Sequence, residues 1–232
     1  MDRKIHNSAA VARVYDQFYR IPRVGQLTLS DGGGPFGFDI SLALEVDWII
    51  GSYSCDGIVE SGCHLGDTTE YLARCYPTTP LTACDTEETY IAVCRHRLQE
   101  MANPEVVLAN SRDWIGEACR GFRLPFVYLD AHGGVDWPLS QELSQIRRGI
   151  VCVHDFDIGH KRFGFDTYSG TVCNSDLLRQ CGIDLSSCFV NDPTAIYPLP
   201  CLQVGRRSGR VFIPIGVTSV YLRQCPYLNP LG

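Results

Sequence analysis

The sequence has no pair of cysteines separated by two residues, although it holds 12 cysteines among 232 residues. Structural zinc sites commonly use such pairs, so the cysteines do not indicate a zinc site. Disulfide-dense proteins are usually short and poor in core residues, whereas 45% of this chain is hydrophobic. Cys84, Cys94 and Cys152 each lie in an apolar run, where cysteine behaves as a small hydrophobic residue. We therefore expect reduced, mostly structural cysteines.

The sequence also lacks a basic tract: no run of Lys and Arg exceeds two residues, and the net charge is -6. A nucleic-acid backbone is therefore a poor candidate partner, and a small molecule is favoured. The longest apolar run, around Trp48–Ile50, is too short to span a bilayer. Charged residues crowd the start of the chain, so no signal segment is expected. These features predict a cytoplasmic protein with no membrane partner and leave a homodimer open.

The length suits one domain with a small N-terminal extension. We expect residues 1–50 to form a helical lead-in that packs on the core, and residues 51–232 to form the main domain. Apolar residues from Val11 to Tyr19 recur at helical spacing. A glycine-rich patch at 31–35 interrupts regular structure, and 40–50 is predicted to be a short amphipathic helix.

From residue 57 the pattern changes to short apolar strands that alternate with segments of helical period. Such alternation predicts an α/β fold with a mostly parallel sheet and helices on both faces. Two further strands are expected in the tail, separated by a turn rich in Gly, Arg and Ser. The predicted strands are 57–60, 81–85, 105–109, 126–130, 150–154, 196–200 and 210–215, and the predicted helices are 67–75, 87–101, 112–119 and 139–147.

Two glycines, Gly62 and Gly66, follow the first of these strands directly and open a helix. Glycine at such a place allows a sharp turn and a close approach of a ligand to the backbone. Asp85 ends the second strand, where an acidic residue can accept hydrogen bonds from both ribose hydroxyls of a nucleoside. The GxGxxG pattern of dinucleotide-binding proteins is absent, and Asp67 at the helix start would repel a phosphate. A dinucleotide enzyme is therefore the weaker interpretation.

Taken in order, Glu60-x-Gly62-x-x-x-Gly66, Asp85, the polar turn at Ser111 and Asp130 resemble the motifs of class I S-adenosylmethionine-dependent methyltransferases. The resemblance covers residues 55–156. It implies a Rossmann-like sheet of seven strands with an antiparallel C-terminal strand. It also implies S-adenosylmethionine as the cofactor, with the methionine moiety near Glu60, the ribose at Asp85 and the adenine near Ser111. The cofactor-binding residues predicted in this way are Glu60, Gly62, Cys63, His64, Gly66, Thr68, Asp85, Thr86, Ser111, Arg112 and Asp130.

Polar residues follow the fourth and fifth strands, where ligands bind in open α/β sheets: Asp130, His132, His154 and Asp155. His132 and His154 are the candidate general bases, because an imidazole is matched to proton transfer near neutral pH. Metal-dependent small-molecule O-methyltransferases resemble this sequence at Asp130 and Asp155, but they usually carry an acid where His154 stands. The predicted metal ligands are Asp130, His154 and Asp155. Hard cations prefer oxygen ligands, so a softer divalent metal, or none, is left open.

The sequence thus predicts transfer of a methyl group from S-adenosylmethionine to an oxygen, or as a weaker alternative a nitrogen, of a small polar acceptor. Two other classes stay open. One is a metal-dependent hydrolase that uses Asp130, His132, His154 and Asp155. The other is a ligand-binding relative that keeps the fold and transfers nothing.

Overall fold

An eight-stranded sheet forms the centre of the molecule. The computed structural model describes residues 6–23, 33–132, 137–203 and 207–232, and the sheet order is β12-β9-β11-β5-β4-β1-β2-β3. Five neighbouring strands are parallel to one another: β3, β2, β1, β4 and β5. Strand β11 is antiparallel to β5 and to β9, and β12 is antiparallel to β9. Their bounds are β1 Gly57–Ser61, β2 Leu81–Asp85, β3 Pro104–Leu108, β4 Pro125–Leu129, β5 Gly149–Val153, β9 Phe189–Asn191, β11 Val211–Ile215 and β12 Leu228–Pro230.

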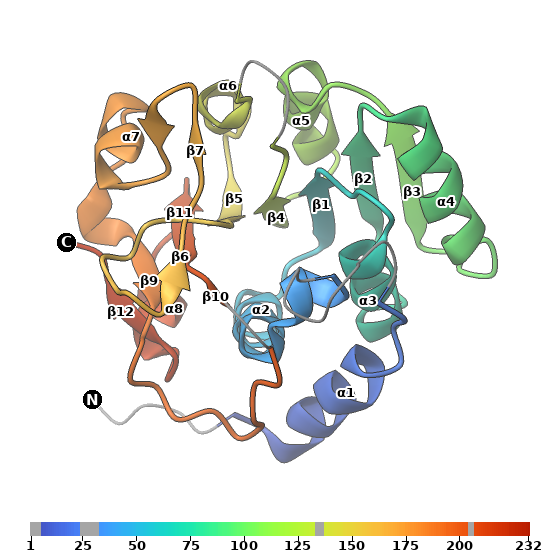
Figure 1. Cartoon of the computed structure of the whole chain (residues 1–232), viewed down its shortest axis with the longest axis horizontal. Coiled ribbons are helices and arrows are strands. Elements are labelled where there is room, and N and C mark those ends of the chain that lie inside the picture. The colour runs from blue at the N-terminus through green and yellow to red at the C-terminus, as the bar shows by residue number, and fades with distance from the viewer. Residues whose placement is uncertain (1–5, 24–32, 133–136, 204–206) are drawn as a thin grey trace.

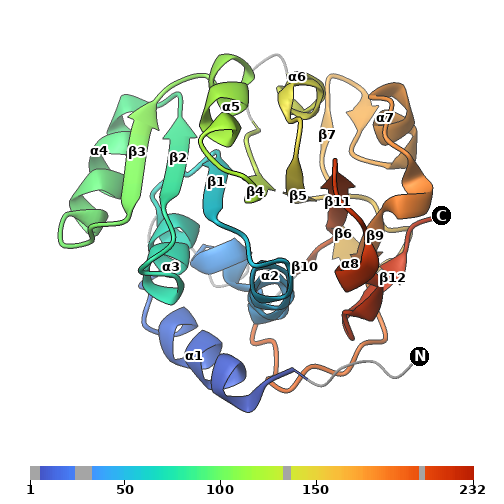
Figure 2. The ribbon, with the colours of Figure 1, turned by 180° about the vertical axis from the view of Figure 1, so that it is seen from behind.

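Helices cover both faces of this sheet (Figures 1 and 2). Alternate residues of each strand face opposite ways, so Ile58 packs with the first group of helices and Val59 with the second. The first group is α1 Ser8–Phe18, α2 Ile40–Tyr53, α3 Asp67–Cys75, α4 Glu88–Leu98 and α8 Val220–Gln224; the second is α5 Ser111–Arg120, α6 Leu139–Gln145 and α7 Ser175–Gln180.

Short elements complete the described chain (Figure 1). Two of them form a tight hairpin, β7 with β8, and another two form a parallel pair, β6 with β10. These elements are η2 Pro35–Phe38, β6 Phe163–Gly164, β7 Thr167–Tyr168, β8 Thr171–Val172, η3 Leu185–Ser187 and β10 Arg207–Ser208.

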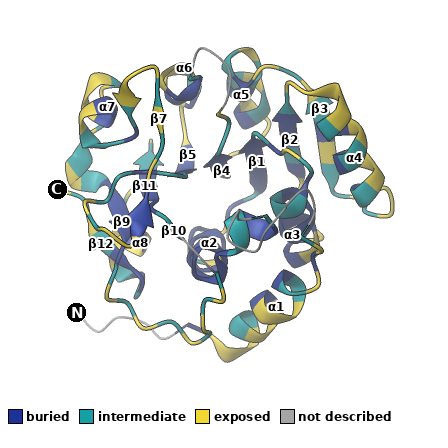
Figure 3. Cartoon of the chain, viewed as in Figure 1, coloured by how far each residue is buried: buried dark blue, intermediate teal, exposed yellow. Residues whose placement is uncertain are grey.

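A helix is present at 40–50 as predicted, but it is not amphipathic, because every residue of α2 from 40 to 50 is buried (Figure 3). Its acids pair with cations from distant parts of the chain. Glu45 and Asp39 bind Arg210, which is 0% exposed, with Nε–Oε2 and Nη1–Oδ2 distances of 2.7 and 2.9 Å. Asp47 pairs with Arg13 at 2.5 Å and also accepts a hydrogen bond from His6 at 3.1 Å. A charged helix can lie in the core only when its charges are paired in this way.

The structure confirms the α/β class, the helices on both faces and the antiparallel C-terminal strand, and corrects the strand count from seven to eight. The predicted strand 196–200 is irregular, and β9 and β12 supply the outer strands instead. The apolar residues of that segment do not enter the sheet; Tyr197 hydrogen-bonds Glu45 and stacks on Tyr227. Residues 204–206 of the predicted turn between the tail strands lie outside the described residues, and Arg207 pairs with Asp39.

Three other features of the described residues bear on the sequence analysis. All 12 cysteines are free and ten of them are buried, as expected for structural thiols. Within the described ranges, none of the helices is both long and apolar enough to cross a membrane. The predicted division after residue 50 falls inside α2, which runs from the lead-in into the main domain.

Candidate active site

The carboxyl ends of β1, β2 and β4 meet at one edge of the sheet. The turn after β1 is held there by Gly62, whose amide donates to the Cys84 carbonyl at 3.0 Å. Its φ is +79°, and a Cβ atom at this position would lie 2.7 Å from the Asp130 carbonyl oxygen and the Ala131 Cα. Only glycine fits this approach, because any side chain would collide with the backbone that follows β4.

A cavity of about 660 Å³ opens beside this turn. Eight of the eleven predicted cofactor residues line it: Glu60, Gly62, Cys63, His64, Thr68, Asp85, Thr86 and Asp130. One predicted base, His132, lines it too. The prediction missed the remaining lining residues, which are Gly33, Gly34, Gly37, Asp67, Glu87 and Tyr90.

The walls of this cavity are strongly acidic. Five of the described residues that line it are Asp or Glu, and none is Lys or Arg: Glu60, Asp67, Asp85, Glu87 and Asp130. Such a wall attracts a cation and repels phosphate groups. Arg97 neutralises part of the charge by pairing with Asp67 from the adjoining helix α4.

Glu60 is the most deeply buried of these acids, with 1% of the residue exposed. Its Oε2 atom has no hydrogen-bond partner among the described residues. Burial raises the pKa of this carboxyl well above its ordinary range. An unsatisfied buried acid that lines a cavity is suited to binding a positively charged group of a ligand.

Asp85 lies at the end of β2 and already accepts two backbone hydrogen bonds. Its Oδ2 atom accepts from the His64 amide at 2.9 Å and its Oδ1 atom from the Glu87 amide at 3.1 Å. Each carboxylate oxygen can accept more than one hydrogen bond. The two amides therefore fix the orientation of the carboxylate and leave it able to accept two hydroxyl groups.

The N-terminal segment contributes a wall that the sequence analysis did not predict. The first residues of α3 hold it in place: Asp67 Oδ2 accepts from the Gly34 amide at 2.7 Å, and Thr68 Oγ1 accepts from the Phe36 amide at 3.0 Å. Gly34 has a φ of +74°, which favours glycine. The cluster of glycines at 32–34 was the one available signal, and it was interpreted only as a break in regular structure.

Three predicted cofactor residues do not line the main cavity. Gly66 begins α3 in the left-handed region, and a Cβ atom there would lie 2.6 Å from the Cys94 Sγ, so this glycine permits close packing of α3 on α4. Ser111 borders a small recess next to Asp85. Arg112 lines a second cleft, beyond His132. The roles predicted for these three residues stay predictions.

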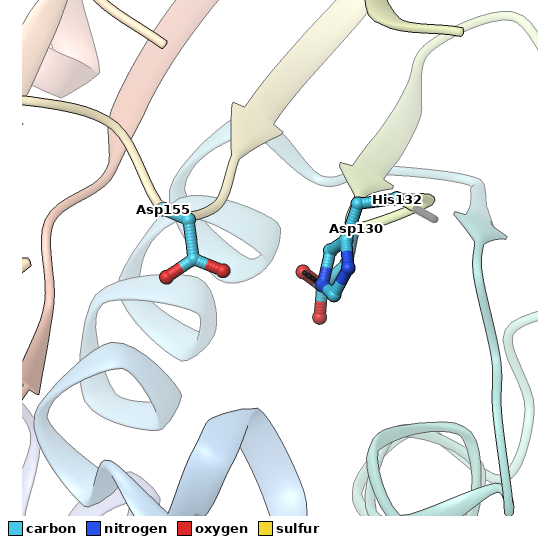
Figure 4. Close-up of side chains that lie close together, drawn as sticks. All are labelled: Asp130, His132 and Asp155. Carbon is cyan, nitrogen blue, oxygen red and sulfur yellow. Dashed lines mark ion pairs between the residues drawn. The ribbon is translucent and has the colours of Figure 1, made fainter. Parts of the chain in front are cut away.

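Asp130, His132, His154 and Asp155 lie together at the ends of β4 and β5, as predicted. Figure 4 shows three of them, Asp130, His132 and Asp155. The Nδ1 atom of His154 lies 3.1 Å from Asp130 Oδ1 and 3.3 Å from Asp155 Oδ2. His132 Nε2 lies 3.6 Å from Asp130 Oδ1. Asp155 adopts a φ of +53°, a strained conformation for a residue with a side chain.

The two histidines differ in exposure and surroundings. The side chain of His154 is 9% exposed, whereas that of His132 is 43% exposed. Burial by itself lowers the pKa of His154, but Asp155 and Asp130 outweigh it and raise this pKa well above the ordinary value. His154 is therefore a cation at neutral pH, with a ring nitrogen already directed at both carboxylates. Such a group is poorly suited to accept a proton, and His132 is the better candidate.

The possible metal ligands also differ from the predicted set. One ligand atom each from Asp130, His132 and Asp155 lies within 4.8 Å of the others (Figure 4). His132 thus stands in the place that the sequence assigned to His154, whose Nδ1 atom is directed at the carboxylates. Two oxygens and one imidazole nitrogen suit a divalent transition metal better than magnesium.

No family model and no curated protein matches this sequence. Solved structures do resemble the fold. One is magnesium protoporphyrin IX methyltransferase from Synechocystis PCC 6803 with bound SAM, which is 13% identical in sequence. The match covers 91% of this chain and 98% of the methyltransferase chain, with a TM-score of 0.50. A protein described as an O-methyltransferase from Klebsiella pneumoniae is 16% identical, with 91% and 92% coverage and a TM-score of 0.48. One described as a caffeoyl-CoA O-methyltransferase from Staphylococcus aureus is 13% identical, with 90% and 93% coverage and a TM-score of 0.47.

The sheet has the features that the resemblance to methyltransferases implied, namely a mostly parallel order and an antiparallel strand near the C-terminus. The parallel strands β3, β2, β1, β4 and β5 are followed across the sheet by the antiparallel strand β11 and then by β9. The cavity lies at the carboxyl ends of these parallel strands, where ligands of open α/β sheets bind. The chain has the fold of the class I S-adenosylmethionine-dependent methyltransferases.

Proposed function

We propose that this protein transfers a methyl group from S-adenosylmethionine to an oxygen, or as the weaker alternative to a nitrogen, of a small polar acceptor. The observation that carries the proposal is the acidic cavity, with five Asp or Glu residues and no Lys or Arg among its described lining residues. S-adenosylmethionine brings a sulfonium and an ammonium group, and both are cations. A dinucleotide would bring phosphates to the same walls and would be repelled.

The residues of the cavity fit this cofactor. Glu60 has a buried carboxylate oxygen without a partner, which the ammonium group of the methionine moiety can satisfy. Asp85 is oriented by two backbone amides and can accept both ribose hydroxyls. Gly62 leaves the backbone bare, so that the ligand can approach it closely. A volume of about 660 Å³ is in the range of cavities that enclose ligands of this size.

The cofactor supplies the methyl group, and the chain supplies position and proton transfer. A hydroxyl is a weak nucleophile until its proton leaves. We propose that His132 accepts this proton, because its ring is half exposed beside the cavity and lies next to Asp130. The cationic His154 holds Asp130 and Asp155 in place from behind. Positioning of the acceptor provides most of the remaining acceleration.

A divalent metal ion at Asp130, His132 and Asp155 is a second, separable part of the proposal. When bound, such an ion lowers the pKa of a coordinated hydroxyl group. If it is required, addition of a chelator stops methyl transfer and addition of the metal restores it. Full activity after chelation dismisses the metal and leaves His132 as the base.

Binding of S-adenosylhomocysteine, the demethylated product, tests the proposal directly. Calorimetry should show micromolar-scale affinity for it and no binding of NAD. Asp85→Asn should weaken the affinity by about 1–3 kcal/mol, or about 5- to 150-fold, because an amide accepts hydroxyl hydrogen bonds less strongly than a carboxylate. Asp113→Asn, an exposed change on α5, is the matched control. Unchanged affinity in Asp85→Asn would remove Asp85 from the site.

A metal-dependent hydrolase is the second candidate function, favoured by the grouping of Asp130, His132 and Asp155. It requires the metal but not the acidic cavity. Metal-dependent hydrolysis by a protein that fails to bind S-adenosylhomocysteine would establish it in place of a methyltransferase. Binding of the cofactor product with no turnover on any acceptor would instead indicate a relative that only binds the ligand.

A further inference from the structure

Two of the buried cysteines lie against the glycine turn that follows β1. Cys63 comes directly after Gly62 and is the one cysteine among the described residues that line the acidic cavity. Cys94 lies on α4 and is 0% exposed. A Cβ atom added at Gly66 would lie 2.6 Å from the Cys94 Sγ and 3.2 Å from the Cys94 Cα. Because Gly66 has no side chain, the turn packs directly on Cys94.

The two thiols meet beneath this turn. The Gly66 amide donates to the Cys63 carbonyl at 2.8 Å, which closes residues 63–66 into one tight turn against α4. The Cys63 and Cys94 side chains are hydrogen-bonded to each other, and this contact raises the pKa of Cys63 and lowers the pKa of Cys94. The positive charge of Arg97, one helical turn further along α4, also lowers the pKa of Cys94. The pair therefore gives up a proton more easily than an isolated buried thiol does.

Cys119, on α5, shows how an isolated buried thiol behaves in this protein. Burial alone raises its pKa to about 12, and it packs in the hydrophobic cluster on the other face of the sheet. Such a thiol reacts slowly, because the thiolate is the nucleophilic form. The Cys63–Cys94 pair differs from it in three ways: a second sulfur is in contact, one pKa is lowered, and one of the two residues borders a cavity.

We propose that Cys63 and Cys94 form a redox-sensitive dithiol, that hydrogen peroxide entering the unliganded cavity oxidises it to a disulfide, and that this disulfide lowers the affinity for the cofactor. The inference rests on the proposed function for the identity of that cofactor, S-adenosylmethionine. It makes the glycine turn a place where the oxidation state of the surroundings controls methyl transfer.

The oxidation proceeds in two displacements. The thiolate of the pair, carried by Cys63 at the cavity wall, attacks one peroxide oxygen; the O–O bond breaks, and the other oxygen leaves as hydroxide and is protonated to water. The Cys94 sulfur then attacks the sulfenic acid formed on Cys63, so that the S–S bond forms, the S–O bond breaks and a second water leaves. Two thiols and one hydrogen peroxide thus give one disulfide and two waters, and the two electrons lost by sulfur reduce the peroxide.

The disulfide changes the surroundings of two residues proposed to bind the cofactor. A covalent bond brings the two sulfurs closer together than a hydrogen-bonded contact does, so the turn must move toward α4. His64, the next residue of this turn, donates its amide to Asp85 Oδ2 at 2.9 Å. Glu60 precedes the same turn and lies near Cys94. Oxidation therefore disturbs the carboxylates proposed for the ribose and for the ammonium group together.

Cofactor binding should protect the pair in return. Cys63 is 3% exposed and lines the cavity, so a ligand that fills the cavity covers its sulfur. Because the oxidised protein binds the ligand weakly, the ligand favours the reduced protein by the same factor. Oxidation of Cys63 and occupancy of the cavity should therefore oppose each other.

The test uses the full reduced chain, hydrogen peroxide as the oxidant and S-adenosylhomocysteine as the ligand. After brief oxidation, tandem mass spectrometry of unreduced proteolytic fragments should find Cys63 joined to Cys94. Calorimetry should then find an affinity at least about tenfold weaker, which dithiothreitol restores. Saturation with S-adenosylhomocysteine beforehand should slow disulfide formation at least about tenfold. A missing Cys63–Cys94 disulfide, an affinity that the disulfide leaves unchanged, or equal rates with and without the ligand each overturn the proposal.

Two variants separate this pair from the other cysteines. Cys94→Ala should bind S-adenosylhomocysteine as the wild type does and should keep this affinity after peroxide treatment. Cys119→Ala, the matched change at a buried thiol on α5, should lose affinity after treatment as the wild type does. Melting temperatures check that each variant is folded, and the fragment analysis of the wild type decides the question if Cys94→Ala is not. An equal loss of affinity in treated Cys94→Ala and wild type overturns the proposal.

Binding by the reduced wild type separates this inference from the proposed function. If the reduced protein binds S-adenosylhomocysteine and peroxide leaves Cys63 and Cys94 as thiols, only the redox assignment fails. If the disulfide forms in a protein that does not bind S-adenosylhomocysteine when reduced, the proposed function fails, and the control of cofactor affinity fails with it while the oxidation site stands.

Discussion

Cofactor binding should release a proton from Glu60. In the free protein, burial raises the pKa of this carboxyl well above its ordinary range, and one of its oxygens has no partner. An ammonium group that binds there favours the ionised form and lowers the pKa. Below the raised pKa, the carboxyl is protonated before binding and ionised after it. Affinity should therefore rise with pH, by up to about tenfold per pH unit, and level off above that pKa.

The size of the Glu60 contribution follows from the same geometry. A hydrogen bond to a charged group contributes about 1.5–3 kcal/mol, so Glu60→Gln should weaken binding of S-adenosylhomocysteine by roughly 10- to 150-fold. The amide keeps the shape of the side chain and cannot titrate, so the variant should also lose this pH dependence. Glu105→Gln, an exposed change on β3, is the control and should alter neither property.

Calorimetry in buffers of different ionisation enthalpy measures the proton directly. At a pH below the raised pKa of Glu60, the observed binding enthalpy of the wild type should change with the ionisation enthalpy of the buffer. The slope of this dependence should correspond to the release of up to one proton for each cofactor bound. In Glu60→Gln this dependence should disappear. A buffer-independent enthalpy in the wild type across pH 5–8, together with unchanged affinity in Glu60→Gln, would refute the assignment of Glu60 to the ammonium group.

The other predictions concern stability and turnover. Burial raises the pKa of Glu142 to about 7 from 4.5. As pH rises, Glu142 therefore ionises first in the unfolded state. The free energy of unfolding should fall by about 3 kcal/mol in total as pH rises from 4.5 to 7. Glu142→Gln should remove this decline in urea titrations, and a decline of the same size in the variant would contradict the assignment. Gly62→Ala should destabilise the protein by about 2–4 kcal/mol, because residue 62 has a positive φ and the added Cβ would contact the backbone after β4. Gly51→Ala is the control: a Cβ there meets open space, so the substitution should stabilise α2 by about 0.5–1 kcal/mol. Equal effects of the two substitutions would show that Gly62 is not needed for its turn. His132→Ala should lower turnover about 100-fold or more and change S-adenosylhomocysteine affinity little, with the exposed His96→Ala as control; full turnover in His132→Ala would leave positioning as the source of catalysis.

The sequence alone determined the features that depend on local pattern. The strands from β1 to β5 and the helices between them were predicted within a few residues, because alternation and helical period act over short stretches of chain. The glycine turn was also predictable, since Gly62 and Gly66 stand where the first strand must turn into a helix. The parallel order then places Glu60, Asp85 and Asp130 at one edge.

Only the tertiary structure decided what depends on contacts between distant residues. Nothing near Glu45 in the sequence indicates its pairing with Arg210, 165 residues away, so a fully buried helix was predicted to be amphipathic. The strand predicted at 196–200 had a suitable local pattern, but Tyr197 in this segment contacts Glu45 and Tyr227, and the segment does not join the sheet.

The candidate active site shows the same limit. The sequence put His132 and His154 at one rim but could not distinguish them, because their difference lies in surroundings rather than in residue type. His154 is buried between two carboxylates, whereas His132 is half exposed beside the cavity. Burial and the distance to neighbouring charges set the protonation state of a histidine, and both are properties of the folded chain.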